Sequence, residues 1–251
     1  MNPFYFGRGD RPLFGLYTPG RSAAGPARSV LLCYPVGPEY MRAHRAFRQL
    51  NNLLNRAGMN VLRFDYACTG DSAGEGGEAT LEEWLADIQL AIDELKDNSM
   101  ADRVDVVGLR WGATLSALAC SAREDVERLV LWDPIVTGRT YLDAHLGTPR
   151  PTGTVGIEGF PFSQRLRDEM DAVDLRIDLD RFKAAVALVV AEDRPEYREL
   201  EQTLAKAAPT FEYEVAPSSG EWAQADPFGD ALIPQQIIQA IVDRLQTQGT
   251  A

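Results

Sequence analysis

Short apolar runs alternate with helix-period segments through most of the 251-residue chain. The apolar runs are Ser29–Pro35, Asn60–Tyr66, Arg103–Gly108, Glu127–Pro134, Ala184–Asp193 and Thr210–Pro217. The helix-period segments are Glu39–Ala57, Thr80–Leu95, Ala113–Ala122, Glu196–Ala207 and Ala231–Leu245. Because parallel strands need crossover connections, usually helices, this order predicts an α/β fold with a mostly parallel sheet and helices on both faces. Aromatic residues around a Gly-Arg-Gly-Asp turn in Phe4–Pro19 predict an antiparallel hairpin, which brings the expected sheet to eight strands.

The alternation is interrupted between Gly138 and Asp180. This stretch is rich in Gly, Pro and acidic residues and holds one short amphipathic segment, about Pro161–Val173. It is too long for a plain loop, so we expect residues 138–180 to form a small cap insertion over the sheet's carboxyl edge. We expect residues 1–251 to form a single domain.

The charge and cysteine content exclude several classes of protein. The formal net charge of -12 argues against a nucleic-acid groove or an anionic membrane surface. No apolar run is long enough for a membrane span. The three cysteines form no C-x-x-C pair, so we expect neither a disulfide framework nor a metal site, and no cofactor. The first residues, MNPFYFGRGD, lack the features of a signal peptide, which predicts a cytoplasmic protein.

Several segments occur in the order and spacing of a known fold: the hairpin, LLCYPVGPEYMRAHRAFRQL, VLRFDYACTGDSAGE, VVGLRWGATLSA and LVLWDP. Together they resemble the α/β-hydrolase fold, and most closely its serine aminopeptidase-like and monoacylglycerol lipase-like branch. That branch includes small bacterial hydrolases associated with exopolysaccharide and exosortase systems. The loop from Asp65 to Ser72 is similar to the branch's D-x-x-G-x-G-x-S loop, with Cys68 in place of a Gly. In that position Ser72 is expected to support the loop.

The resemblance implies a nucleophile elbow at VVGLRWGATL, a tight turn between a strand and a helix. Gly108 and Gly112 provide the small residues that such a turn needs. The central residue, however, is Arg110, where Ser, Cys or Asp would act as the nucleophile. A guanidinium stays protonated up to a pH of about 12 and cannot attack a carbonyl.

The resemblance also implies a histidine base after the last strand, yet VAPSSGEWAQADPFGD contains none. The two histidines, His44 and His145, lie on the first helix and in the expected cap. Only the acid has a match, at Asp193 or Glu192. The triad is therefore degenerate, and acyl transfer by a Ser-His-Asp triad is not expected. The serines of SSGEW stand where the base would be and are interpreted as a turn.

An arginine at the start of a helix places positive charge on the positive end of the helix dipole. Arg110 should therefore have an anionic partner. The candidates are Asp133, which ends the next strand, Asp193, one strand further, and a ligand carboxylate or phosphate. Two interpretations remain open: an internal pair with Asp133 that fills the pocket, and an anion clamp in a working pocket.

Five further residues are candidates for substrate binding. The resemblance implies an oxyanion hole formed by the backbone N–H groups of Val36 and Trp111. His44 either reaches the pocket mouth or faces solvent. Cys68 lies near the expected site but has no evident base. Trp132, like Trp111, either packs in the core or forms a wall for an apolar ligand.

These observations predict an enzyme that keeps the hydrolase pocket without the triad. Arg110, Asp133 and Asp193 would supply binding and acid–base chemistry on a small acyl, carbonyl or anionic substrate. Two alternatives remain open. One is a non-catalytic binding or scaffold protein with a protein partner, and the other is an ester or thioester hydrolase with an unconventional nucleophile.

Overall fold

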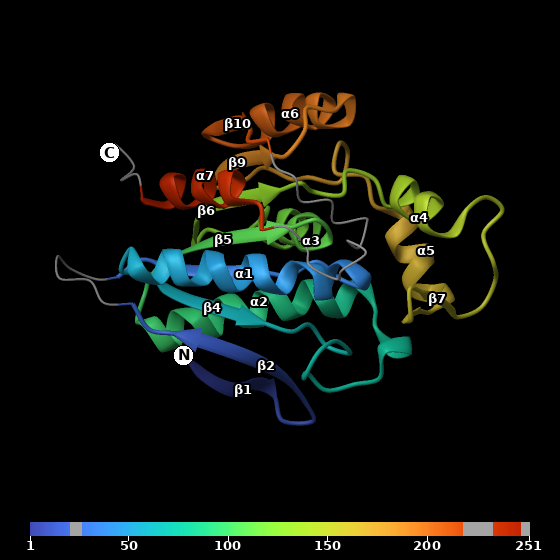
Figure 1. Ribbon diagram of the computed structural model, residues 1–251, viewed down its shortest axis with the longest axis horizontal. Helices are drawn as coiled ribbons and strands as arrows, with labels where there is room; N and C mark the ends of the chain where they lie inside the picture. The colour runs from blue at the N-terminus through green and yellow to red at the C-terminus, as the bar shows by residue number, and fades with distance from the viewer. Residues whose placement is uncertain (21–26, 218–232, 247–251) are drawn as a thin grey trace.

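An eight-stranded sheet runs through the centre of the molecule in the order β1-β2-β4-β3-β5-β6-β9-β10 (Figure 1). The computed structural model describes residues 1–20, 27–217 and 233–246. Its strands are β1 Asn2–Arg8, β2 Arg11–Thr18, β3 Ser29–Cys33, β4 Asn60–Phe64, β5 Val104–Leu109, β6 Val126–Trp132, β9 Ala185–Val190 and β10 Phe211–Val215. The hairpin β1–β2 is antiparallel and joins β4 antiparallel, and the strands from β4 to β10 are parallel. The predicted fold class is confirmed.

Helices cover both faces of this sheet (Figure 1). α1 Pro38–Arg56 packs with α7 Gln235–Gln246 on one face, and α2 Leu81–Ser99 packs with α3 Trp111–Cys120 on the other. α6 Pro195–Ala207 packs beside β10. Every residue of β3, β4 and β5 is buried, which explains why apolar residues occur on both faces of these strands rather than alternating with polar ones.

Residues between β6 and β9 form two short helices and a small hairpin. The helices are α4 Gly138–Leu146 and α5 Gln164–Ala172, which pack together, and the hairpin strands are β7 Val155–Ile157 and β8 Phe160–Phe162. The helix predicted over about Pro161–Val173 begins later than expected, because Phe160–Phe162 pair with β7 and Ser163 caps α5. The prediction that residues 138–180 act as a cap within one domain stays a prediction.

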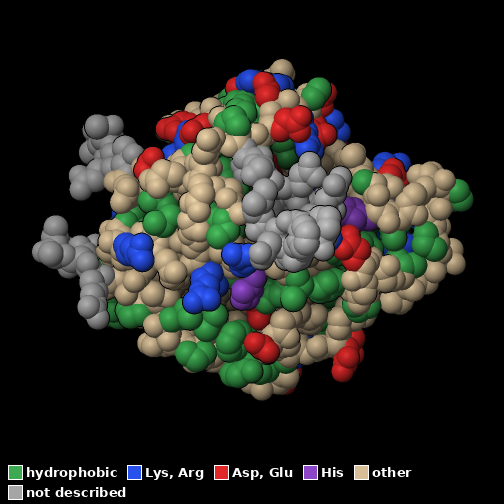
Figure 2. Space-filling model, in the orientation of Figure 1, with side chains coloured by type: hydrophobic (Ala, Val, Ile, Leu, Met, Phe, Trp, Pro, Cys, Tyr) green, Lys and Arg blue, Asp and Glu red, His purple; other side chains and the backbone are tan. Residues whose placement is uncertain are grey.

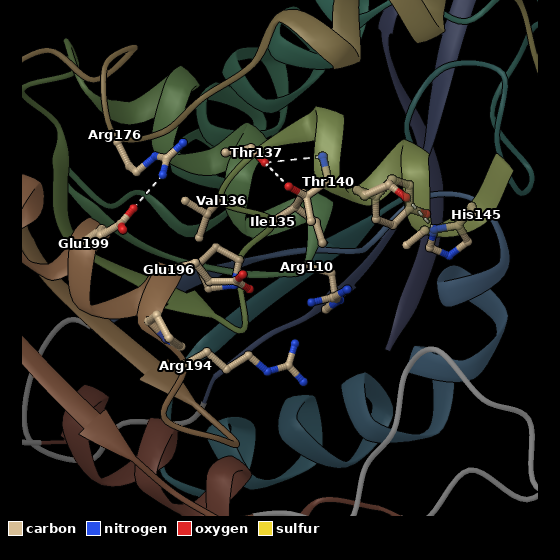
Figure 3. Close-up of a pocket in the computed structure, with 14 residues that line it drawn as sticks. Arg110, Ile135, Val136, Thr137, Thr140, His145, Arg176, Arg194, Glu196 and Glu199 are labelled. Atoms are coloured by element: carbon tan, nitrogen blue, oxygen red, sulfur yellow. Dashed lines mark hydrogen bonds and ion pairs between the residues drawn. The ribbon is translucent and has the colours of Figure 1, made fainter. Parts of the chain in front are cut away.

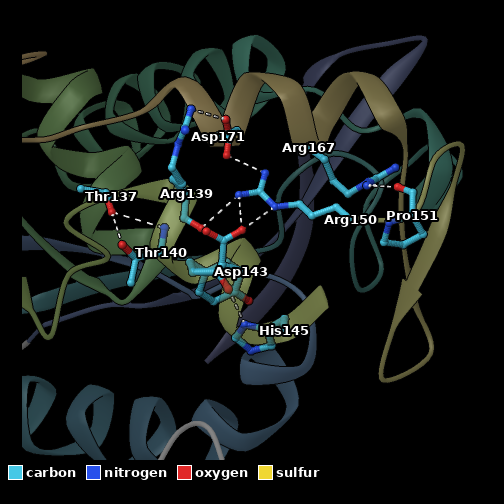
Figure 4. Close-up of polar contacts among 10 residues, drawn as sticks. Thr137, Arg139, Thr140, Asp143, His145, Arg150, Pro151, Arg167 and Asp171 are labelled. Atoms are coloured by element: carbon cyan, nitrogen blue, oxygen red, sulfur yellow. Dashed lines mark hydrogen bonds and ion pairs between the residues drawn. The ribbon is translucent and has the colours of Figure 1, made fainter. Parts of the chain in front are cut away.

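Arg150 links α4 to α5 (Figure 4). Its Nε donates to Asp143 Oδ1 at 2.8 Å, and its Nη1 donates to Asp171 Oδ1 at 2.5 Å. Arg167 of α5 is buried and donates to the backbone oxygens of Pro151 and Gly153. These bonds hold the loop between α4 and β7 against α5.

Among the described helices, none has the length and apolarity needed to cross a membrane.

Candidate functional site

The turn between β5 and α3 has the tight geometry predicted for it. Arg110 has φ +54°, a left-handed value that side chains adopt rarely. A Cβ added to Gly108 would lie 2.4 Å from the Gly112 oxygen, and one added to Gly112 would lie 2.3 Å from the Cys33 oxygen. Both positions therefore require glycine, and they present Arg110 at the end of β5, at the sheet's carboxyl edge.

Arg110 pairs with Glu39, in the first turn of α1. Arg110 Nε donates to Glu39 Oε1 at 3.0 Å, and Nη1 donates to the Asp133 backbone oxygen at 3.3 Å. The Glu39 side chain has no exposed surface, and that of Arg110 is 16% exposed. Burial would lower the pKa of Arg110, but Glu39, Tyr197 and Asp133 raise it above its ordinary value, so the guanidinium stays charged.

The ion pair of Arg110 is with Glu39 and not with the Asp133 or Asp193 carboxylate, although the charge of Asp133 helps to raise the pKa of Arg110. Asp133 Oδ1 instead accepts a hydrogen bond from the Ala191 backbone N–H at 2.8 Å, which ties β6 to the loop after β9. Asp193 is half-exposed and pairs with Arg198 at 2.6 Å, an interaction that lowers its pKa. Sequence periodicity placed these carboxylates at the correct edge of the sheet, but it could not tell which way each one turns.

Glu39 was missed in the sequence, although a signal for it exists. It is the only acidic residue in α1, where every other charged residue is an arginine. Basic side chains are visible over this helix in Figure 2. A lone carboxylate at the buried start of a basic helix indicates a specific partner.

Arg110 lines a cavity of about 490 Å³ (Figure 3). The cavity lies between the loop after β6, α4 and the start of α6. Its lining combines three arginines, two glutamates, apolar side chains, hydroxyls and one histidine: Arg110, Arg176, Arg194, Glu196, Glu199, Pro134, Ile135, Val136, Ala144, Pro195, Thr137, Thr140, Tyr141 and His145. This volume is within the range that holds a small ligand.

His145 is a second residue whose place the sequence did not reveal. Its Nδ1 lies 2.8 Å from the Tyr141 backbone oxygen, one turn earlier in α4, which assigns the proton to Nδ1 and leaves Nε2 as an acceptor. Its ring packs against Tyr141 with centroids 4.2 Å apart. His145 therefore belongs to the cavity wall that Arg110 shares, although the two are 35 residues apart in sequence (145 − 110).

His44 lies elsewhere, on the exposed side of α1. It stacks on Tyr34 with centroids 5.7 Å apart, and burial together with Arg63 lowers its pKa. The two histidines form separate patches in Figure 2. The solvent-facing interpretation of His44 agrees with this position, and its predicted role in substrate binding stays a prediction.

The tryptophans of the expected site are fully buried. Trp132 stacks on Phe47 with centroids 6.2 Å apart and a tilt of 8°. Trp111 meets Tyr141 edge to face at 5.7 Å. Trp132 is not among the residues that line this cavity, and its predicted role in ligand binding stays a prediction. The backbone oxyanion hole at Val36 and Trp111 stays a prediction.

The loop after β4 is held together internally. Cys68 Sγ accepts a hydrogen bond from Arg11 Nη2 at 3.1 Å, and burial raises the pKa of the thiol, which makes it a poorer nucleophile. Ser72 Oγ donates to the Asp65 backbone oxygen and accepts from the Phe14 N–H. These contacts agree with a supporting role for Ser72. The predicted turn at SSGEW lies outside the described residues.

Solved structures with the same architecture identify the class of fold. Est1E from Butyrivibrio proteoclasticus with bound ferulic acid aligns with a TM-score of 0.75 at 15% identity, over 97% of this chain and 96% of that one. Proline iminopeptidase of Mycobacterium smegmatis aligns with a TM-score of 0.67 at 14% identity, over 97% of each chain. A Pyrococcus furiosus esterase gives 0.62 at 18% identity, over 85% of this chain and 80% of that one. The chain therefore has the α/β-hydrolase fold.

A family model matches slightly less than half of the chain. Residues 40–156 match the family described as serine aminopeptidase, S33, so the predicted resemblance to that branch is confirmed. The match includes Arg110 and the elbow, begins one residue after Glu39 and ends before Asp193. A comparison with curated protein sequences gave no match. Among the described residues, no cluster of three or more His, Cys, Asp or Glu side chains could hold a metal ion.

Proposed function

We propose that this protein is a hydrolase-like enzyme that binds a small acyl or carbonyl compound with a negative charge and acts on it without forming an acyl-enzyme. Arg110 is the electrostatic clamp. The observation that carries this proposal is the guanidinium at the elbow position, on the wall of a ligand-sized cavity.

The clamp has donor capacity left for a ligand. Arg110 uses Nε for Glu39 and Nη1 for the Asp133 backbone oxygen, and within the described residues Nη2 has no hydrogen-bond partner. A guanidinium can present two parallel N–H donors to a carboxylate or phosphate. A carbonyl oxygen bound there would be polarised by a permanent positive charge in a site of low dielectric.

Covalent attack has little support among the described lining residues. The hydroxyls of the cavity belong to Thr137, Thr140 and Tyr141. Thr137 Oγ1 caps α4 by accepting from the Thr140 N–H, and none of the three hydroxyls bonds to His145. An activated nucleophile needs a base within hydrogen-bond reach.

A covalent probe tests the absence of an acyl-enzyme. The intact protein is incubated with a fluorophosphonate and, separately, with p-nitrophenyl acetate and butyrate, and is then examined by mass spectrometry. We expect no adduct and no burst of p-nitrophenol. An adduct on any Ser, Thr or Cys near the cavity would favour a hydrolase with an unconventional nucleophile and would overturn the proposal.

A substitution tests the clamp. Arg110→Lys keeps the positive charge but loses the planar donor pair. With hexanoate as a simple probe that joins a carboxylate to an apolar chain, binding measured by calorimetry should weaken about tenfold or more. Circular dichroism checks that the variant is folded. Unchanged binding would contradict the role of Arg110.

The cavity lining also favours a second candidate, a protein that binds this ligand without transforming it, because no hydroxyl among the described lining residues is paired with a base. Both candidates share the clamp. Product analysis after prolonged incubation of the protein with a bound acyl ligand separates them, because only the enzyme consumes it.

A further inference from the structure

We propose that the cavity recognises a carboxylate on a short apolar chain, held between Arg110 and Arg194, and that Arg194 selects the charged ligand over a neutral one. This inference rests on the proposed function and names the ligand class of the same site. Arg194 precedes α6 and was not singled out in the sequence.

The first observation is that two helices start at this cavity with an arginine. Arg110 is the N-cap of α3 and Arg194 the N-cap of α6, and neither side chain makes a capping hydrogen bond. Among the described α-helices, α2, α4 and α5 begin with side chains that do cap: Thr80, Thr137 and Ser163. An arginine adds positive charge to a helix end that is already positive, which favours nearby anions, and a ligand carboxylate would add to the two that these arginines already contact, Glu39 and Glu192.

The second observation is the free capacity of Arg194. Its Nε donates to Glu192 at 3.0 Å, and within the described residues neither terminal nitrogen has a hydrogen-bond partner. The side chain is half-exposed at the cavity rim. Figure 3 shows its guanidinium extending into the space next to Arg110. Both arginines line the same cavity.

The third observation is an unsatisfied polar atom on the same wall. Tyr141 lines the cavity and is 4% exposed, and its hydroxyl has no hydrogen-bond partner in the described part of the chain. Leaving a buried hydroxyl unpaired costs free energy, on the order of 1–3 kcal/mol in proteins. A ligand oxygen or a water beside it would remove that cost.

The other lining residues indicate what the rest of the ligand, beyond its carboxylate, should be like. Pro134, Ile135 and Val136 contribute an apolar part of the lining. Glu199 Oε2 forms an ion pair with Arg176 Nη1 at 2.6 Å. Glu196 makes no ion pair among the described residues. Glu196 would repel a second anionic group. The lining therefore fits a monocarboxylate with an apolar tail better than a dicarboxylate.

Calorimetry with matched probes tests the ligand class. Hexanoate, hexanamide, succinate and inorganic phosphate are titrated into the full-length protein. We expect hexanoate to bind. The other three compounds should bind at least about tenfold more weakly. Equal binding of hexanamide would overturn the role of charge, and preferred binding of succinate or phosphate would overturn the monocarboxylate class.

Two variants test the role of Arg194 in binding the carboxylate. Arg194→Gln should weaken hexanoate binding about tenfold without changing that of hexanamide. Arg198→Gln is the matched control, because Arg198 lies one turn further along α6 and pairs with Asp193 away from the cavity. It should bind hexanoate like the unchanged protein.

The two proposals can fail separately. If Arg110→Lys weakens hexanoate binding and Arg194→Gln does not, this inference is wrong and the clamp of the proposed function stands. If neither substitution changes binding, both are wrong.

Discussion

Arg110 and Glu39 depend on each other, because each buries a charge that the other neutralises. Removing one partner of a buried ion pair leaves an uncompensated charge and typically costs about 3–5 kcal/mol. We therefore expect Glu39→Gln to lower the free energy of unfolding by roughly that amount, as measured by urea denaturation.

A double-mutant cycle checks that the loss comes from the pair. Combining Glu39→Gln with Arg110→Gln removes both charges, so the double variant should be more stable than the sum of the two losses predicts, by about 1 kcal/mol or more. Strict additivity of the two losses would show that the two side chains do not interact.

Asp105 makes the stability of the protein depend on pH. It lies in β5, bonds to Arg28 at 2.5 Å and has an unpaired Oδ1, and burial raises its pKa from 3.8 to about 6. Because the folded-state pKa lies above the unfolded value, the contribution of Asp105 to stability is fully present below about pH 4 and is lost as pH rises through about 6.

This pH dependence can be measured with one substitution. Asp105→Asn cannot ionise, so its free energy of unfolding should fall less between pH 4.5 and pH 7.5 than that of the unchanged protein. The difference is on the order of 2–3 kcal/mol for a shift of about two pKa units. Parallel stability curves for the two proteins would contradict it.

At the scale of single elements, the elbow between β5 and α3 is the most constrained. Alanine at 112 would place its Cβ against two backbone oxygens, those of Cys33 and Tyr34, each 2.3 Å away. Backbone cannot move aside as a flexible side chain can. We expect Gly112→Ala to lower the free energy of unfolding by more than about 3 kcal/mol or to prevent folding. Soluble yield and thermal melting measure this, and Gly77→Ala, with nothing within 4 Å of its Cβ, is the control.

The pairing of α4 and α5 leads to a further prediction. Arg150 bonds to Asp143 and Asp171 in partly exposed positions, where each ion pair contributes about 0.2–1 kcal/mol. Arg150→Gln should therefore increase hydrogen exchange in residues 147–157 while the global melting temperature changes little. Arg139→Gln, which removes a more exposed contact with Asp171, should leave that exchange unchanged.

The elements were predictable because their signals are local. The buried runs of β3 and β5 and the helix that begins after Thr80 are properties of neighbouring residues, and the structure contains them as predicted. The start of α5 was predicted too early, because the pairing of β8 with β7 is a contact between strands that helix periodicity does not report.

At the scale of the whole molecule, the cavity is assembled from distant segments. Arg110 comes from the elbow, Tyr141 and His145 from α4, and Arg194 from the start of α6. Helix and strand periods place Arg110 at the sheet edge, but they carry no information on which loops meet above it. The sequence therefore predicted the edge and the central arginine, and missed Arg194, His145 and the partner Glu39.

The bond between α1 and the elbow has a consequence for any replacement of Arg110 by a serine. Arg110→Ser alone would supply a hydroxyl but leave the buried Glu39 carboxylate without its cationic partner. Glu39→Gln alone would leave the Arg110 guanidinium without its anionic partner. Stepwise exchange in either order passes through an unstable intermediate, so the two positions, 71 residues apart, would have to change together.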